Sequence, residues 1–173
     1  PISRLTDEEV IARCPWATTG RTHHRTPNII TSLELDPAEM EKRNIHLQKK
    51  YAEIEENEVR FEELHCEDSE YLIVAFGSCA RIAQKAMEMA REEGIKVGLL
   101  RPITLWPFPS KAIAARAAQV KGILTVELNA GQMVEDVRLA VKCKVPVEHF
   151  GRLGGIVPDP DEVITALKEK LIK

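Results

Sequence analysis

The chain has 173 residues, a formal net charge of −3, and 44% hydrophobic and 29% charged residues. This composition is typical of a globular protein large enough to bury a core, and there is no basic cluster with interleaved aromatic residues for a nucleic acid. No apolar run approaches the roughly 20 residues that span a membrane. The start at Pro1 has neither the pattern of a secretory signal nor an initial methionine, which is typical of a fragment.

Residues 1–35 are polar and weakly periodic, which predicts an irregular connector with one short helix. The helix signal is "TDEEVIARC", where Thr6 and Glu9 have the spacing of a capping box. The following "ATTGRTHHRTPNII" is expected to be irregular and exposed. Its adjacent His23 and His24 make a poor metal site, because neighbouring side chains on an extended chain point apart.

Residues 36–58 predict a long linker helix. Asp36 is the expected N-cap, Pro37 takes the first helical position, and Glu39 follows. A narrow stripe runs along this otherwise charged helix at spacings of four and three, through Met40, Asn44, Leu47, Tyr51 and Ile54. The apolar stripe of such a helix packs either along its own domain or partly against another chain.

Residues 59–173 alternate between strands and helices. The continuous apolar runs "YLIVAFG", "IKVGLLRP", "GILTVELN" and "VPVEHFG" are each followed by a helical segment. This pattern indicates a parallel sheet buried on both faces. The alternating "VRFEELH", residues 59–65, is expected to add an edge strand. We therefore predict a three-layer α/β/α domain with a mostly parallel sheet.

The candidate site residues lie where the strands end, because ligands and partners of an open parallel sheet gather at the carboxyl ends of its strands. Those ends carry Ser78, Cys79, Arg101, Glu127, Asn129, Gln132 and Arg152. They contain no nucleophile–base pair, no metal-binding set and no nucleotide fingerprint, so we assign no catalytic, cofactor-binding or metal-binding residue. The four cysteines are far apart, which argues against a zinc or iron–sulfur site and fits a reducing cytoplasm.

Each of these residues has a structural and a functional interpretation. Ser78 either caps the following helix or helps to hold an anion there, and Cys79 is expected to be a packed thiol. We expect Glu127 to pair with Arg101 on a neighbouring turn rather than to be catalytic. Arg152, in the glycine-rich "GRLGGIVPDP", suits a carboxylate or phosphate, but an ordinary connection between strand and helix explains it nearly as well.

The segment "RPITLWPFP", residues 101–109, combines three prolines with two aromatic residues. Pro102 is expected to end its strand, and Pro107 and Pro109 to keep the residues before them extended. The rings of Trp106 and Phe108 either pack on the domain's own core or project as interface anchors. We predict a domain or subunit interface that includes Arg101, Trp106, Phe108, Glu127, Asn129, Gln132 and Arg152.

The motifs "RPITLWPFP", "VELNAGQMVEDVR" and "GRLGG" resemble the α chains of 2-oxoacid:ferredoxin oxidoreductases. The segment "SLELDPAEMEKRNIHLQKKYAEIEENEVRFEE" is similar to the linker of their 2-oxoisovalerate (branched-chain) members. The resemblance implies that this is the C-terminal part of an α chain, with a transketolase C-terminal-like domain that has one antiparallel edge strand. The "THH" of the connector departs from the family pattern, so no role is carried over to its histidines.

For the whole enzyme, the resemblance implies thiamine diphosphate, Mg, iron–sulfur clusters and coenzyme A. The implied reaction is oxidative decarboxylation of a 2-oxoacid, 2-oxoisovalerate in the most similar members, to an acyl-CoA with electrons passed to ferredoxin. The implied partners are the N-terminal domain of the α chain, β and γ subunits, a second α chain and ferredoxin. This part is expected to organise assembly and to be inactive alone.

Two other functions stay open. One is a small-ligand or nucleotide-binding module of flavodoxin-like topology. The other is the matching domain of a pyruvate-dehydrogenase-type or transketolase enzyme.

Overall fold

The computed structural model describes residues 4–14, 16, 29 and 31–172, and it divides into two units, residues 1–45 and 46–173. The predicted connector, with His23 and His24, lies almost wholly outside the described residues. Among the residues that are described, no helix is long and apolar enough to cross a membrane. The expected division into residues 1–35, 36–58 and 59–173 stays a prediction.

The first unit contains the predicted short helix, α1 (Asp7–Arg13). Its capping box is formed in both directions. The N–H of Glu9 donates to Thr6 Oγ1 at 3.3 Å, and the N–H of Thr6 donates to Glu9 Oε2 at 2.8 Å. Two backbone donors that the helix leaves unpaired are therefore satisfied locally, which is why the sequence pattern is sufficient to locate this helix.

A long helix, α2 (Pro37–Asn57), begins in the first unit and ends in the second. The N–H groups of Ala38 and Glu39 donate to Asp36 Oδ1 at 2.8 and 3.3 Å, so Asp36 is the N-terminal cap that the sequence predicts. The helix is described in full and has no buried residue. Of the predicted stripe, only Met40, Leu47 and Ile54 are half-buried.

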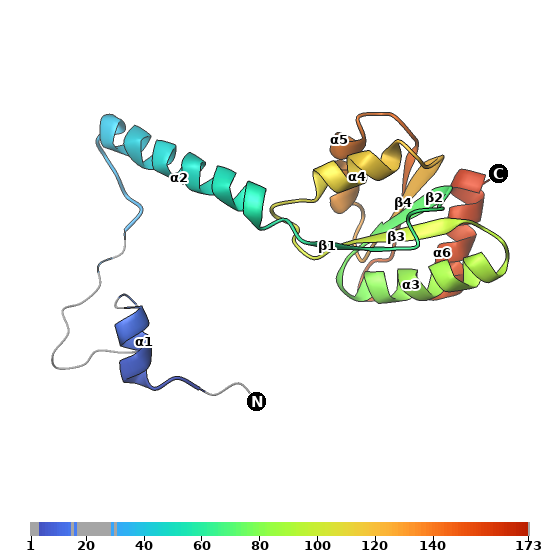
Figure 1. Cartoon of the computed structure of the whole chain (residues 1–173), viewed down its shortest axis with the longest axis horizontal. Coiled ribbons are helices and arrows are strands. Elements are labelled where there is room, and N and C mark those ends of the chain that lie inside the picture. The colour runs from blue at the N-terminus through green and yellow to red at the C-terminus, as the bar shows by residue number, and fades with distance from the viewer. Residues whose placement is uncertain (1–3, 15, 17–28, 30, 173) are drawn as a thin grey trace. The chain divides into compact units, whose positions relative to one another are not determined.

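The second unit is built on a five-stranded sheet with the order β1-β3-β2-β4-β5, in which β1 alone is antiparallel (Figure 1). The strands are β1 (Phe61–Leu64), β2 (Tyr71–Ala75), β3 (Val97–Pro102), β4 (Gly122–Glu127) and β5 (Val147–Gly151). The helices are α3 (Gly77–Glu92), α4 (Ser110–Ala117), α5 (Met133–Val141) and α6 (Pro160–Leu167), and α6 continues as a π-helix, η1 (Lys168–Ile172). The predicted α/β class and the antiparallel edge strand are confirmed.

Both faces of the sheet are covered by helices, as Figure 1 shows. Ile73 of β2 belongs to a core cluster with α3 and α6, whereas its neighbour Leu72 belongs to a second cluster with α4 and α5. Successive residues of one strand point to opposite faces, so a strand buried on both faces must be apolar at every position. This explains the continuous apolar runs in the sequence.

The expectation that Pro102 ends its strand is confirmed. β3 ends at Pro102, which lies opposite Phe61 of β1. Beyond it, the N–H groups of Ile103 and Thr104 both donate to the carbonyl of Arg60, at 2.9 and 3.1 Å. The pairing of β3 with β2 has already ended at Leu100, so the N–H that proline lacks is not needed on that side.

A two-bond ion pair joins the edge strand β1 to α4. The guanidinium of Arg116 donates to both carboxylate oxygens of Glu63, at 2.8 and 2.7 Å, and both side chains are largely buried. Arg116 also donates to the carbonyl of Cys66 at 3.4 Å. Hydrogen bonding to Arg116 lowers the pKa of Glu63 from its ordinary value, and burial raises the pKa of Cys66 to about 11.

The Glu63–Arg116 pair predicts a pH-dependent contribution to stability. The folded pKa of Glu63 lies below its unfolded value, so the stabilisation is complete above about pH 4.3 and is lost as the pH falls through the folded pKa. Glu63→Gln should lower the free energy of unfolding by about 1.5–3 kcal/mol at pH 7, and this difference should shrink in acid. Urea unfolding between pH 7 and pH 3 measures it.

The matched control is Glu62→Gln, on the same strand. Glu62 pairs with Arg101 at 2.8 Å, but both side chains are about half-exposed, so the loss should stay below about 1 kcal/mol. Equal losses for the two variants at pH 7, or a Glu63→Gln loss that does not depend on pH, would contradict the assignment.

Candidate functional site

Glu127, at the end of β4, is fully buried and caps the next helix. Its Oε2 accepts from the N–H groups of Gln132 and Met133 at 3.1 and 2.8 Å, and its Oε1 accepts from Val134 N–H at 3.0 Å. These donors are at the start of α5, where the helix dipole favours a negative charge. The carboxylate therefore replaces a conventional N-cap side chain, and its two oxygens are already occupied.

The expected pair between Glu127 and Arg101 is wrong. β2 lies between β3 and β4, so the ends that carry the two residues are not adjacent. Arg101 turns to the opposite neighbour and donates to Glu62 Oε2 of β1 at 2.8 Å. The Nε atom of Arg101 is buried and has no hydrogen-bond partner in the described part of the chain.

His149, which lies on β5 beside Glu127, was not identified from the sequence. Its Nδ1 lies 3.2 Å from Thr125 Oγ1 and 3.3 Å from Glu127 Oε1, and its Nε2 lies 3.3 Å from the carbonyl oxygen of Asn129. Thr125 and His149 are direct partners in the pairing of β4 with β5. A Cβ at Gly151 would overlap that Asn129 carbonyl and lie 2.7 Å from His149 Nε2, so only glycine lets the chain pass the imidazole.

Of the remaining predicted polar residues at the strand ends, Asn129 and Arg152 have local structural partners. Asn129 Oδ1 accepts from Gly131 N–H at 2.8 Å and closes the turn before α5. Arg152 pairs with Glu162 Oε1 at 2.6 Å, so it joins the end of β5 to the first turn of α6. The side chain of Gln132 is exposed. The structure thus satisfies Arg152 without an anionic ligand.

The helix that follows β2, α3, begins at a different residue from the one expected. The N-cap of α3 is Phe76, so Ser78 lies inside the first turn, and it forms no capping bond in the described structure. Cys79 is buried, and burial raises the pKa of its thiol. The expectation of a capping serine is therefore wrong, whereas that of a packed thiol at Cys79 is confirmed.

The two aromatic residues of the 101–109 segment have different environments. Trp106 is 56% exposed, and Phe108 is half-buried against the core cluster of α4 and α5. The indole of Trp106 meets the ring of Tyr51, on α2, edge-on with centroids 5.5 Å apart. The flanking Pro107 is buried, and Thr104 Oγ1 donates to its carbonyl at 2.8 Å. Phe108 therefore packs on the domain's own core, whereas an interface role for Trp106 stays a prediction.

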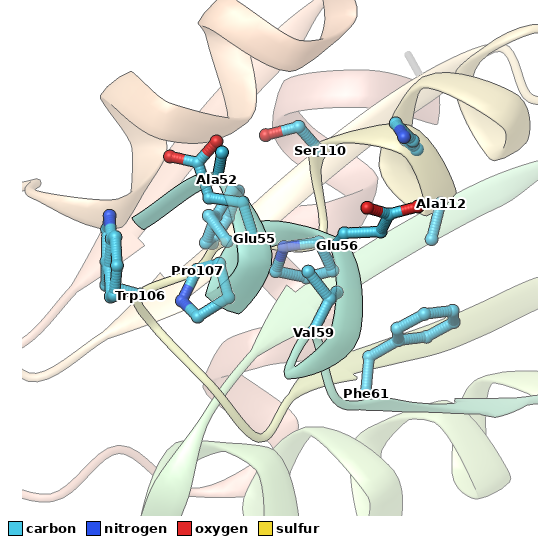
Figure 2. Close-up of a pocket in the computed structure, with 12 residues that line it drawn as sticks. Ala52, Glu55, Glu56, Val59, Phe61, Trp106, Pro107, Ser110 and Ala112 are labelled. Carbon is cyan, nitrogen blue, oxygen red and sulfur yellow. The ribbon is translucent and has the colours of Figure 1, made fainter. Parts of the chain in front are cut away.

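A groove of about 970 Å³ lies between the end of α2 and this segment (Figure 2). One wall is the last turn of α2, with the carboxylates of Glu55 and Glu56. The other wall is the segment from Trp106 to the start of α4. The lining residues are Ala52, Glu55, Glu56, Val59, Phe61, Trp106, Pro107, Phe108, Pro109, Ser110, Lys111 and Ala112. We call this the α2 groove.

The predicted site residues do not converge on one centre. Glu127 and Asn129 meet His149, whereas Arg101, Arg152 and Trp106 lie in separate local arrangements. Within the described ranges, no group of three or more His, Cys, Asp or Glu residues could hold a metal ion. The arrangement at the carboxyl ends of the strands is suited to holding turns and helix starts in place, and the α2 groove is an open feature of the described surface.

The capping role of Glu127 predicts a large effect of a small change. Glu127→Gln places an amide group among three N–H donors, so one donor loses its acceptor, and the free energy of unfolding should fall by about 2–3 kcal/mol. Glu135→Gln is the control, because Glu135 is exposed in the first turn of the same helix and should contribute less than about 1 kcal/mol. Urea unfolding at pH 7 compares them, and equal losses would contradict a dedicated cap.

Comparison with known proteins gives a consistent family assignment. The family model of the pyruvate:ferredoxin oxidoreductase core domain II matches residues 69–163. Ketoisovalerate oxidoreductase subunit VorB of Methanothermobacter thermautotrophicus is 45% identical over 165 residues, which is 94% of this chain and 46% of that protein. VorB of Methanothermobacter marburgensis is 44% identical over 89% of this chain and 43% of its own length. The chain thus spans less than half the length of these relatives.

Solved structures agree with the sequence matches. The 2-oxoglutarate:ferredoxin oxidoreductase from Magnetococcus marinus, with 2-oxoglutarate, coenzyme A and succinyl-CoA bound, matches with a TM-score of 0.68 and 25% identity, over 79% of this chain and 24% of that chain. A split-gene transketolase, an inactive β4 tetramer, matches with a TM-score of 0.56 and 20% identity over 65% and 41%, which shows a shared fold alone. The resemblance seen in the sequence is therefore confirmed, and the chain belongs to the 2-oxoacid:ferredoxin oxidoreductases through their pyruvate:ferredoxin oxidoreductase core domain II.

Proposed function

We propose that this chain is part of the α subunit of a thiamine-diphosphate-dependent 2-oxoacid:ferredoxin oxidoreductase. The complete enzyme would decarboxylate a 2-oxoacid oxidatively to an acyl-CoA and pass the electrons to ferredoxin. The similarity to VorB along nearly the whole chain carries the proposal and favours 2-oxoisovalerate as the substrate. The transketolase likeness is one of fold and does not favour a transketolase reaction.

Within that enzyme, the chain's own role is to organise assembly. The oxygens of Glu127 are taken by three N–H groups and the side-chain oxygen of Asn129 by a fourth, so neither residue is suited to hold the Mg of a bound diphosphate. We therefore place thiamine diphosphate, Mg, coenzyme A and the iron–sulfur clusters on other parts of the complex. The partners are an N-terminal domain of the α chain, β and γ subunits, a second α chain and ferredoxin, in the cytoplasm.

The first test separates this chain from the complete enzyme. The assembled complex should reduce a viologen dye with 2-oxoisovalerate and coenzyme A, and with a higher kcat/KM than with 2-oxoglutarate or pyruvate. The 173-residue chain alone should neither reduce the dye nor bind thiamine diphosphate with Mg in a calorimeter. Tight one-to-one binding by the chain alone would overturn the organising role and make Glu127 a catalytic candidate again.

A second test concerns the predicted interface around Trp106. Trp106→Ala should weaken assembly of the complex by about 2 kcal/mol or more, roughly 30-fold in the dissociation constant, as truncation of an interface anchor does. In the isolated chain, the same variant should lose distinctly less than the roughly 3–5 kcal/mol of a core tryptophan, because its ring is more than half exposed.

Phe108→Ala is the matched control on the same segment. Phe108 packs on the core, so its truncation should lower the free energy of unfolding more than Trp106→Ala does. If Trp106→Ala unfolds the isolated chain as severely as Phe108→Ala and leaves assembly unchanged, Trp106 is a packing residue and not an anchor.

A further inference from the structure

The last turn of α2 carries an unfavourable arrangement of charge. Glu55 and Glu56 lie in this turn, which contains no basic residue. The carbonyl groups at a helix C-terminus already create a negative potential, so carboxylates are disfavoured there and cations are favoured. Neither glutamate has an ion pair or a hydrogen bond from its side chain within the described residues. The chain therefore keeps two uncompensated carboxylates where its own stability disfavours them.

Both carboxylates face the α2 groove, whose charge is unbalanced. Of the residues that line it, Glu55 and Glu56 contribute two negative charges and Lys111 one positive charge, which leaves a net charge of −1. Figure 2 shows the two glutamates on the α2 wall of the groove, with Trp106 and Pro107 nearby and Phe61 farther along. One additional cation in the groove would balance the charge of its lining.

The groove also offers an aromatic surface for that cation. Trp106 is 56% exposed, and within the described residues its ring meets one other aromatic ring, that of Tyr51, edge-on. An arginine guanidinium stacks on an indole and donates two parallel hydrogen bonds to a carboxylate, so it uses both features at once. Phe61, which is 38% exposed, supplies apolar surface in the same groove.

We propose that the α2 groove binds a segment of a partner subunit that inserts an arginine side chain flanked by apolar residues. This proposal rests on the proposed function for the identity of the partner, and on the charge and aromatic lining of the groove for its chemistry. The guanidinium lies against Trp106 and, together with Lys111, balances the two negative charges of Glu55 and Glu56, while its apolar neighbours cover Phe61. Carboxylates at the rim disfavour a nucleic acid or an anionic membrane surface as the occupant.

The groove is tested first without any partner subunit. The 173-residue chain is titrated with the peptide acetyl-Leu-Arg-Leu-amide, and the indole N–H resonance of Trp106, assigned with Trp106→Phe, is followed by NMR. The matched peptide contains citrulline, which has the shape of arginine without its charge. The arginine peptide should shift the resonance saturably and bind at least tenfold more tightly. Equal binding of the two peptides, or no shift with either, overturns the proposal.

The two glutamates are tested by a double variant with a matched control. E55Q/E56Q should weaken binding of the arginine peptide at least tenfold and weaken assembly of the complex by a similar factor. E41Q/E92Q changes the net charge equally at exposed positions outside the groove and should leave both unchanged. Thermal unfolding provides a folding check, because E55Q/E56Q should melt at the same temperature as the parent chain or higher.

The outcomes separate this inference from the proposed function. If no complex with 2-oxoacid oxidoreductase activity can be assembled, the proposed function fails, and the two peptides and the double variants still decide the chemistry of the groove. If the complex is active and the arginine peptide binds, but E55Q/E56Q assembles as well as E41Q/E92Q does, the assignment of the groove to a partner subunit is overturned.

Discussion

Burial of the sheet on both faces is the constraint on which the rest of the second unit depends. The residues of β4, from Gly122 to Glu127, are all buried. A charged side chain on this strand therefore needs hydrogen-bond partners within the protein, and these are found at the end of the strand. The carboxylate of Glu127 meets this condition by accepting from three N–H groups that α5 would otherwise leave unpaired. The negative charge of Glu127, at the carboxyl end of β4, thereby stabilises the start of α5.

The same constraint explains how the polar residues at the strand ends are distributed. Arg152 joins β5 to α6, Arg101 joins β3 to β1, and the turn of Asn129 holds His149 at its carbonyl. Each of these groups therefore bonds to a neighbouring element. In the described part of the chain, these polar side chains therefore hold neighbouring elements together.

Much of the fold could be predicted because its signals are local. The caps at Thr6 and Asp36, the continuous apolar strands and the alternating edge strand each depend on residues close together in sequence. Strand order does not, and the pairing of Glu127 with Arg101 failed because β2 lies between their strands. His149 was missed for a related reason, since its environment exists only once β4 and β5 pair in register.

The sequence could not separate Trp106 from Phe108 either. Both follow the same proline-rich pattern, and which ring reaches the core depends on the position of α4 and on the turn that Thr104 closes. The prolines predict a stiff segment but not the direction of each ring. Exposure of Trp106 is a tertiary property, and so is the groove that its ring helps to form.

Arg60, the residue directly before β1, links two segments that are far apart in the sequence. The carbonyl of Arg60 accepts from Ile103 and Thr104, and its N–H donates to Thr104 Oγ1 at 3.0 Å, so both of its backbone groups are bonded to the proline-rich segment. Arg60 thus joins the backbone after α2 to the base of the Trp106 segment. Because Arg60 directly precedes β1 and Ile103 directly follows β3, this junction continues the pairing of β1 with β3 beyond the ends of both strands.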